Sequence, residues 1–564
     1  MKKNVLLVIL ILSAFSLSCS RKKGNMIYIH ELSDFQGLNP YTTSDASASS
    51  MFKKIFDGLL EQDYETSELY PSVAEALPKV SDDHLSYTFT IKKNVKFSDG
   101  HALTSKDVLF SFKALKNPLI IDAAPNRTYV DDVADVLTPD DYTVEIKMKK
   151  PYFMAMFQLG DVRLLPKHVL DPNNLTDKYT IAETNDTTAV ASNVAMKQFA
   201  DWFSKAEIKR DSKYLVGSGP YMMDEWKTGE YVRFKKNPNY WNTTDKWREQ
   251  QPEMIVGKII NDRQAAITAL KSKELDFMEY VPPPMYDEQI DVAKVDHLQK
   301  ELSDQSVYTY IGWNTARPIF SDKKVRQALS HMVDRDMLMK TIVRGYATKQ
   351  NSPVYQSRPD YDKTLTGYEF NAEKAKQLLT EAGWGDSDGD GILDKTINGE
   401  NKKFEFSITI NAGNEARENI SILVSNELKK HGIICRVQKL EWSVFLENTR
   451  SHNFDAYIGS WVNDAIPTDL FQLWHSSAAK NSGSNYVSFI NKRADELMEG
   501  MRLEFDDAKR NAMSVELQRI IYEESPYTFL YSPKYPSVYN KRLKNVKFYP
   551  VRPGYNICNW MIEQ

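Results

Sequence analysis

The chain has 564 residues, too many for one simple hydrophobic core, so its length predicts two or three domains. Its 72 basic and 76 acidic residues are mixed along the sequence and leave a net charge of −4. This balance excludes the basic footprint on which nucleic-acid-binding proteins depend, and we expect no nucleic acid among the partners.

The N-terminal segment has the pattern of an export signal. Lys2 and Lys3 precede an apolar run of 13 residues, Val5 to Leu17, which has signal-peptide length and is too short to span a bilayer. The run ends at a sequence similar to a lipoprotein processing box, Ser16-Leu17-Ser18-Cys19, although Ser16 stands where such boxes usually have leucine. We predict a lipoprotein signal peptide over residues 1–19 with lipidation at Cys19, and a polar tether over residues 20–25. An ordinary signal peptide with a chance cysteine is the alternative.

The segments that follow predict a mixed α/β chain. A strand at Tyr87–Ile91 leads into a tight turn at Asp99-Gly100, and a helix then begins at a capping box formed by Thr104 and Asp107. Val108, Phe112 and Leu115 fall on one face of that helix. Alternating residues predict further strands at 144–148 and 231–234. The polar segment 171–211 predicts a peripheral insertion with one short helix near 199–203.

The second half of the chain alternates amphipathic helices with strands. Residues 322–337 predict one helix, because Val325, Leu329 and Met332 recur at helical spacing. Asn371 is placed to cap a helix that Gly383 ends, and another helix is expected over 417–430. Strand-like segments follow at 435–437 and 454–458.

Several motifs, in a fixed order, resemble the family 5 extracellular solute-binding proteins, the ligand-catching component of peptide and nickel ABC importers. The resemblance spans essentially the whole chain after the signal segment. It rests on these segments: Pro71–Leu115, Gly217–Tyr221, Lys236–Trp241, Phe320–Leu329 and Ala372–Gly383. His101 and Ser105 depart mildly from the family pattern.

The resemblance implies an α/β, two-lobed periplasmic-binding-protein (Venus flytrap) fold with an accessory domain inserted in lobe I. Lobe I would be discontinuous, over residues 26–60, 210–304 and 536–564. The accessory domain would span residues 61–209, and lobe II residues 305–535. This division places Cys435 and Cys558 in different lobes, so we expect free, buried thiols, although two cysteines in an exported protein could also pair.

The resemblance also implies a ligand site between the lobes. Peptide-binding members use a Trp-x-x-Asp element of lobe II, whose carboxylate holds the ligand's α-ammonium, and Trp461 and Asp464 match it. Trp442 is a second candidate for a wall of the cleft. The alternative for Asp464 is a loop acid that caps a backbone turn before Pro467, and for both tryptophans it is core packing.

A basic residue expected of dipeptide binders is missing. Dipeptide-binding relatives have an arginine for the ligand carboxylate near the end of the strand equivalent to residues 404–410, where this sequence has Asn411. Asn411 is therefore a candidate ligand-binding residue, and Arg417, the nearest base, is expected inside the following helix. We expect longer peptides to fit better than dipeptides.

An acidic loop predicts a second site. The acids at positions 1, 3, 5 and 9 repeat the first half of a calcium-binding loop, but position 12 is Ile397 and not glutamate; these acids are Asp386, Asp388, Asp390 and Asp394. Structural calcium and a plain surface turn remain open alternatives. No cofactor is expected to be required for binding.

The sequence gives little support for an enzyme. The 9 histidines show no His-Glu-x-x-His or similar metal pair, and Gly-x-Ser-x-Gly is absent. We therefore predict a monomeric, membrane-anchored extracytoplasmic lipoprotein, periplasmic or on the cell surface, that captures oligopeptides and delivers them to an ABC permease in the inner membrane. The alternatives are the same fold with a metal chelate, haem, sugar or signalling peptide, and, more remotely, a secreted hydrolase.

Overall fold

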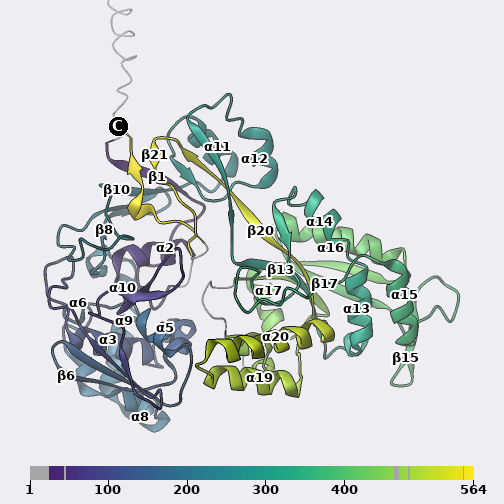
Figure 1. Cartoon of the computed structure of the whole chain (residues 1–564), viewed down its shortest axis with the longest axis horizontal. Helices are drawn as coiled ribbons and strands as arrows, with labels where there is room; N and C mark the ends of the chain where they lie inside the picture. The colour runs from purple at the N-terminus through teal and green to yellow at the C-terminus, as the bar shows by residue number, and fades with distance from the viewer. Residues whose placement is uncertain (1–23, 44–45, 463–468, 481–482, 550–551, 564) are drawn as a thin grey trace, which may run out of the picture.

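A computed structural model describes residues 24–43, 46–462, 469–480, 483–549 and 552–563. Figure 1 shows two bodies, one that carries the N-terminal strands and helices and one that carries β13 and β17 with α13–α20. These are the two lobes of the predicted fold class. None of the helices in the described ranges has the length and the apolar character that crossing a membrane requires.

One long mixed sheet runs through both lobes. The order of its strands is β18 (Ile434–Leu440), β17 (Glu405–Asn411), β19 (Ala456–Val462), β13 (Val307–Trp313), β20 (Tyr527–Asn540), β11 (Phe277–Met278), β1 (Met26–Glu31), β10 (Met254–Ile259), β9 (Tyr231–Lys236) and β8 (Tyr221–Lys227). Two further strands, β12 (Leu298–Asp304) and β14 (Ala347–Lys349), also pair with β20.

Strand β20 belongs to both lobes. Its first half pairs with β13 and β14, and its second half, from Lys534 to Asn540, pairs with β12 and β11. The chain crosses once more at Gln305–Ser306, between β12 and β13. The predicted boundary at residues 535–536 falls inside β20. The crossing strands therefore form the hinge about which the lobes can move.

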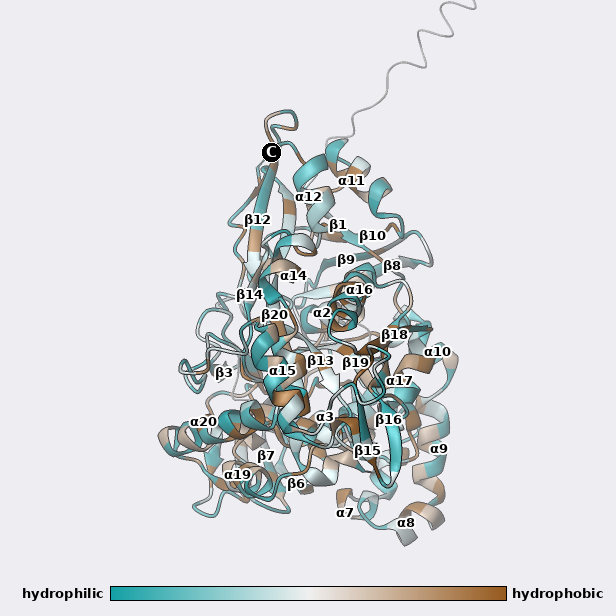
Figure 2. Cartoon of the chain, turned by 90° about the vertical axis from the view of Figure 1, so that its right-hand side faces the viewer, coloured by the Kyte–Doolittle hydropathy of each residue, from teal (hydrophilic) through white to brown (hydrophobic). Residues whose placement is uncertain are grey.

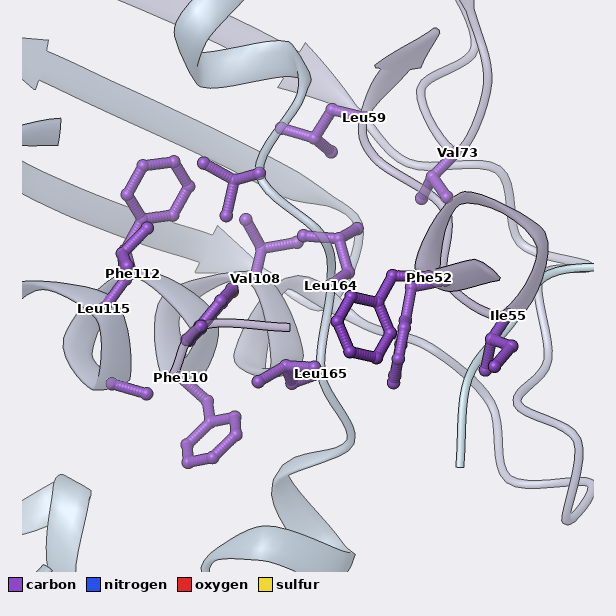
Figure 3. Close-up of a cluster of buried hydrophobic side chains, with 14 of the residues drawn as sticks. Phe52, Ile55, Leu59, Val73, Val108, Phe110, Phe112, Leu115, Leu164 and Leu165 are labelled. Carbon is purple, nitrogen blue, oxygen red and sulfur yellow. The ribbon is translucent and has the colours of Figure 1, made fainter. Parts of the chain in front are cut away.

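The accessory domain is built on a smaller antiparallel sheet, in the order β4 (Lys79–Val80), β5 (Ser86–Thr90), β7 (Thr143–Met148) and β6 (Val133–Asp140). Helix α3 (Ser105–Lys116) begins at the predicted capping box, where Asp107 accepts a 2.9 Å hydrogen bond from the Thr104 amide. Figure 3 shows Val108, Phe112 and Leu115 of α3 in one cluster with Phe52 and Ile55 of α2 (Ala46–Ile55). The accessory domain and lobe I therefore share a continuous core.

Helices cover the remaining surfaces. Lobe I also has α11 (Arg263–Lys271) and α12 (Pro283–Gln289). The accessory domain has α4 (Ala124–Arg127), α5 (Ala155–Gly160), α6 (Lys167–Leu170), α7 (Ile181–Thr184), α8 (Thr187–Ser192), α9 (Val194–Phe203) and α10 (Ala206–Arg210). Lobe II has α13 (Lys323–His331), α14 (Arg335–Thr341), α15 (Ala372–Glu381), α16 (Glu415–Lys429), α17 (Trp442–Arg450), α18 (Phe471–Trp474), α19 (Lys492–Leu503) and α20 (Asp507–Glu524).

Small pairs of strands lie outside these sheets: β2 (Leu60–Gln62) with β3 (Leu69–Pro71), β15 (Asp394–Ile397) with β16 (Glu400–Lys403), and β21 (Leu543–Lys544) with β22 (Met561–Ile562). Figure 2 shows the β15–β16 hairpin largely in hydrophilic colours. The short 3₁₀ turns are η1 (Ile121–Ala123), η2 (Thr128–Val130), η3 (Leu175–Lys178), η4 (Ser212–Tyr214), η5 (Pro318–Phe320), η6 (Ser476–Ala479) and η7 (Ile557–Asn559).

Two predictions of secondary structure are wrong. The single helix expected over 322–337 is two helices, because Asp334 leaves the helical conformation and caps α14 through the Met337 amide. The segment 171–211 contains α7 to α10 and not one short helix. Its α9 buries Phe199 and Phe203 in the shared core, so the segment is part of the packing.

The cysteine prediction is confirmed. Cys435 and Cys558 are free and buried, and they belong to different hydrophobic clusters, one around β17 and the other around β1.

Candidate functional site

The carboxyl ends of three parallel strands form one edge of lobe II. Strand β17 pairs in parallel with β18 and β19, so Asn411, Leu440 and Val462 end at the same side of the sheet. Val462 also lies opposite Val307, the first residue of β13 after the hinge crossing. In open α/β sheets ligands bind beyond the carboxyl ends of the strands, and this edge adjoins the hinge.

The carboxyl ends of the parallel strands of lobe I also point toward the hinge. Strands β1, β10 and β11 are parallel and end at Glu31, Ile259 and Met278. Strand β11 is antiparallel to β20, and the Val281 amide beyond it bonds to the carbonyl of Pro536, close to the crossing point. The carboxyl edges of both lobes therefore meet at the hinge, which defines the candidate site between them.

The structure places the predicted lobe II residues at this edge as far as it describes them. Asn411 is the last residue of β17, Trp442 is the first residue of α17, and Trp461 is the last but one of β19. Asp464 lies outside the described residues, as does Cys19. The binding roles of all these residues stay predictions.

A cluster of buried tyrosines holds the side chain of Trp461 in place. The half-buried indole donates a 3.2 Å hydrogen bond from Nε1 to the Tyr527 hydroxyl. Tyr527 stacks on Tyr310 with 3.8 Å between ring centroids, and the hydroxyls of Tyr310 and Tyr457 are 2.7 Å apart. Burial raises the pKa of Tyr310, Tyr457 and Tyr527, so the cluster stays neutral and fixes the indole.

Trp442 differs from Trp461 in exposure. It is 53% exposed, and its ring is stacked on Phe445 with an interplanar angle of 15°. An exposed aromatic face at the mouth of a cleft can cover a ligand at low conformational cost. Core packing, the alternative for this tryptophan, is contradicted by its exposure.

Arg417, expected from the sequence as the nearest base inside the helix after Asn411, lies in that helix and beside Asn411. It lies in the first turn of α16, where its Nη1 donates a 2.8 Å hydrogen bond to Oδ1 of Asn411. The guanidinium lies over the Phe445 ring at 5.7 Å, and its electrostatic neighbours are Tyr310, Tyr457 and Tyr531.

The charge of Arg417 has no carboxylate within ion-pair distance among the residues that the structure describes. Burial lowers the pKa of its guanidinium, but arginine is not deprotonated in proteins, so the group is a cation at neutral pH. A half-buried cation without a carboxylate partner can receive an anion. Its spacing from Asn411 in sequence was visible, but the direction of its side chain was not.

The facing edge of lobe I carries a carboxyl group with a raised pKa. Glu279 follows β11, and burial together with the nearby charge of Glu31 raises its pKa to about 7, against the opposing effect of Arg552 and Lys54. This edge can therefore present a carboxylate whose charge changes near neutral pH.

A second contact joins the accessory domain to lobe II away from the hinge. Asp469 accepts a 2.8 Å hydrogen bond from the Tyr152 hydroxyl and a 2.6 Å bond from Nη2 of Arg502 in α19. The Phe153 amide donates to the Arg502 carbonyl at 3.0 Å. Figure 1 shows α5 and α19 facing each other at this place. The accessory domain and lobe II are thus in contact at this bridge, in addition to the connection of the lobes at the hinge.

The acidic loop is only partly arranged as a calcium site. Carboxylate oxygens of Asp386, Asp388 and Asp394 converge within 4.8 Å of one another. Lys403 forms ion pairs with both Asp390 and Asp388, and Asp394 accepts hydrogen bonds from Ser387. Calcium binding stays a prediction.

Comparison with known proteins identifies the family and the fold. Residues 68–483 match the family described as bacterial extracellular solute-binding proteins, family 5 Middle. The oligopeptide-binding protein AppA of Bacillus subtilis (strain 168) is 33% identical over 535 residues, which cover 93% of this chain and 89% of AppA. The dipeptide-binding protein of Escherichia coli (strain K12) is 25% identical over 584 residues, covering 98% and 97%.

Solved structures show the same fold. AppA from Bacillus subtilis in complex with a nonapeptide has a TM-score of 0.73 at 29% identity and covers 96% of this chain and 99% of its own. NikZ from Campylobacter jejuni in complex with Ni(L-His) has a TM-score of 0.75 at 24% identity, with coverage of 95% and 99%.

Proposed function

Because this chain belongs to the bacterial extracellular solute-binding proteins of family 5, we propose that it captures oligopeptides between its lobes and delivers them to an ABC permease in the inner membrane. The oligopeptide-binding relative and the nonapeptide complex support a peptide ligand. On this proposal the chain binds its ligand without turning it over.

The observation that carries the proposal is the unpaired charge of Arg417. A peptide has a carboxylate at one end, and a half-buried arginine without a carboxylate partner among the described residues is suited to receive it. In the sheet, β17 lies between β18 and β19. Trp442 follows β18 and Trp461 lies in β19, so the two tryptophans flank the strand that precedes Arg417. Their aromatic faces can cover a peptide main chain without selecting among side chains.

Asp464 is proposed to hold the other end of the peptide. An ammonium that leaves water in a closed cleft needs a fixed counter-charge. We predict that Asp464→Ala weakens binding by about 2–5 kcal/mol, roughly thirtyfold to several thousandfold in Kd. Isothermal titration calorimetry with a bound peptide measures this change, and a loss under about threefold would remove Asp464 from the site.

The experiment that tests the function is mass spectrometry of the small molecules released when the purified protein is denatured. Release of mixed short peptides is expected and gives the range of lengths that the cleft accepts. Release of one metal chelate, haem, sugar or single signalling peptide would keep the fold and overturn the proposed ligand class. Chemically altered products of an added peptide would instead indicate a hydrolase.

The mature protein is proposed to be a monomer held at a membrane by a lipid on Cys19. The apolar run before Cys19 and the family's extracellular location support this proposal. Metabolic labelling with a fatty acid, compared between the wild type and Cys19→Ala, tests the anchor, and light scattering tests the oligomeric state.

The acidic loop is proposed to hold a structural calcium ion through Asp386, Asp388 and Asp394. We predict binding in the millimolar range or tighter, with a higher Tm in calcium, and loss of both in Asp388→Ala. Calorimetry that shows no calcium binding in that range, together with an unchanged Tm of Asp388→Ala, would contradict the prediction.

A further inference from the structure

Two histidines and one aspartate converge on the surface of the accessory domain. The turn before α3 supplies Asp99 and His101, and α6 supplies His168, which is 69 residues from Asp99. The histidines form no metal-binding pair along the sequence, because His101 and His168 are far apart in the chain. We propose that Asp99, His101 and His168 bind a divalent transition-metal ion, with Zn²⁺ as the representative cation.

Both imidazoles direct a nitrogen at the same carboxylate oxygen. Nε2 of His168 is 2.7 Å and Nδ1 of His101 is 3.3 Å from Oδ2 of Asp99. All three atoms lie within 4.8 Å of one another. Bonds of about 2.0–2.2 Å in a tetrahedral zinc site place neighbouring ligand atoms about 3.3 Å apart. An ion can therefore enter this triangle after a small movement of the rings.

The backbone holds the aspartate in place for this role. Oδ1 of Asp99 accepts a 3.1 Å hydrogen bond from the His101 amide, which turns Oδ2 toward the imidazoles. Gly100 has a φ of +94°, which a residue with a Cβ rarely adopts, so the glycine lets the turn bring His101 back beside Asp99. The Gly100 amide bonds to the Phe97 carbonyl at 2.9 Å and closes the turn.

The charges around the cluster suit a cation. The rings of His101 and His168 stack with 4.0 Å between centroids, so one ion can reach a nitrogen of each ring. Asp107 adds a second carboxylate to the electrostatic environment of His168. Lys167, next to His168 in sequence, directs its ammonium at Asp177 and Asn174. The carboxylates of Asp99 and Asp107 would therefore balance the charge of a divalent ion bound to both rings.

The donor set distinguishes this site from the acidic loop. Two imidazole nitrogens and one carboxylate suit zinc, nickel or copper, whereas the oxygen-only loop suits calcium. The side chains of His101, Asp99 and His168 are 64%, 30% and 30% exposed, so an ion can enter from solvent and keep a water as its fourth ligand. The bound ion would join the turn to α6 and stabilise the accessory domain.

The test is calorimetric titration of Zn²⁺ into protein purified without a histidine tag and stripped with a chelator. One ion per chain is expected at micromolar concentration, with a rise in Tm. His101→Ala and His168→Ala should each raise the Kd for Zn²⁺ by more than about tenfold. About tenfold is the smaller effect expected when the lost residue only hydrogen-bonds to a metal ligand. His331→Ala is the matched control, because His331 is half-buried, contacts Tyr368 and bonds only to the Glu369 carbonyl in the part of the chain that the structure describes, away from the cluster.

Two measurements separate a metal site from a hydrogen-bonded cluster. Co²⁺ in place of Zn²⁺ should give the visible absorption of a nitrogen-ligated, low-coordinate ion, and Asp99→Asn should reduce it while circular dichroism stays unchanged. Equal Zn²⁺ affinity in the wild type and His101→Ala would overturn the proposal, as would the absence of binding below millimolar Zn²⁺. His101 is largely exposed, so its removal does not depend on refolding of the core.

Discussion

The charges buried where lobe I meets the accessory domain and the charge at the edge of lobe II are compensated in different ways. Arg248 contacts Asp57 at 2.7 Å and Glu61 at 2.8 Å, and Arg163 contacts Glu61 as well. All four side chains are at least nine-tenths out of water. The chain thus supplies both signs of charge in one closed cluster.

At the edge of lobe II, Arg417 has only the neutral side chain of Asn411 as a hydrogen-bond acceptor among the described residues. Burial of a charged side chain alone therefore does not identify a binding site. A charge whose partners are all in the chain belongs to the architecture, whereas a half-buried charge without such a partner has capacity left for a ligand.

Removing Arg248 should have the largest effect on the fold. Arg248→Met leaves the carboxylates of Asp57 and Glu61 buried without one of their partners, and we expect a loss of about 3–5 kcal/mol in the free energy of unfolding. Urea denaturation measures it. Arg436→Met, which breaks an exposed pair with Glu405, is the control and should cost under about 1 kcal/mol. Equal effects of the two variants would erase the contrast between the two regions.

Removing Arg417 should separate binding from stability. Arg417→Met is expected to weaken peptide binding by about 2–5 kcal/mol, because the ligand carboxylate loses its counter-charge. The free energy of unfolding should change by less than about 1 kcal/mol, since no buried carboxylate is orphaned. Calorimetry with a peptide identified in the released mixture, together with urea denaturation, measures both quantities. Unchanged affinity would assign Arg417 to the architecture after all.

The pH dependence of stability should distinguish Glu279 from Glu61. Burial would raise the pKa of Glu61, but Arg163 and Arg248 hold it at about 2, so its contribution is present at neutral pH and is lost on acidification. The pKa of Glu279 is raised to about 7, so the folded state binds the proton more tightly than the unfolded state. Stability should therefore fall as the pH rises from about 5 to about 8, by up to about 3 kcal/mol.

Glu279→Gln tests this sign, because the glutamine cannot ionise. Its unfolding free energy should lack the fall that the wild type shows over this range, and the variant should be the more stable protein at pH 8. Denaturation curves at several pH values provide the comparison. A wild type whose stability rises with pH in the same manner as the variant would contradict the raised pKa.

Local signals in the sequence were sufficient for many elements. Asn371 caps α15, as predicted, and Gly383 follows that helix with a φ of +81°. The break between α13 and α14 was missed because the apolar residues of both helices continue one helical spacing, while the cap at Asp334 is a competing local interaction.

The positions of the candidate residues were predictable where they depend on strand ends, and not where they depend on side-chain direction. The resemblance to the family pointed to Asn411 and Trp461, and the structure places both at the ends of strands, with Trp442 at the start of the helix after β18; their roles in binding stay predictions. The orientation of Arg417 toward Tyr310 and Tyr457 depends on how α16 packs on β17, which no local pattern contains. The meeting of His101 with His168 likewise depends on tertiary packing between segments distant in sequence.

The position of β20 near the C-terminus determines which lobe can be completed first during synthesis. Lobe I is begun by β1, but its sheet includes β20, and the guanidinium of Arg542 bonds to the carbonyl of Met26, 516 residues earlier. The core around β1 also contains Leu543, Ile557 and Trp560. Ribosomal synthesis proceeds from the N-terminus, so the first lobe to emerge is the last to be completed. The N-terminal lobe of a nascent chain therefore lacks part of its sheet and core until β20 and the segment after it have been made.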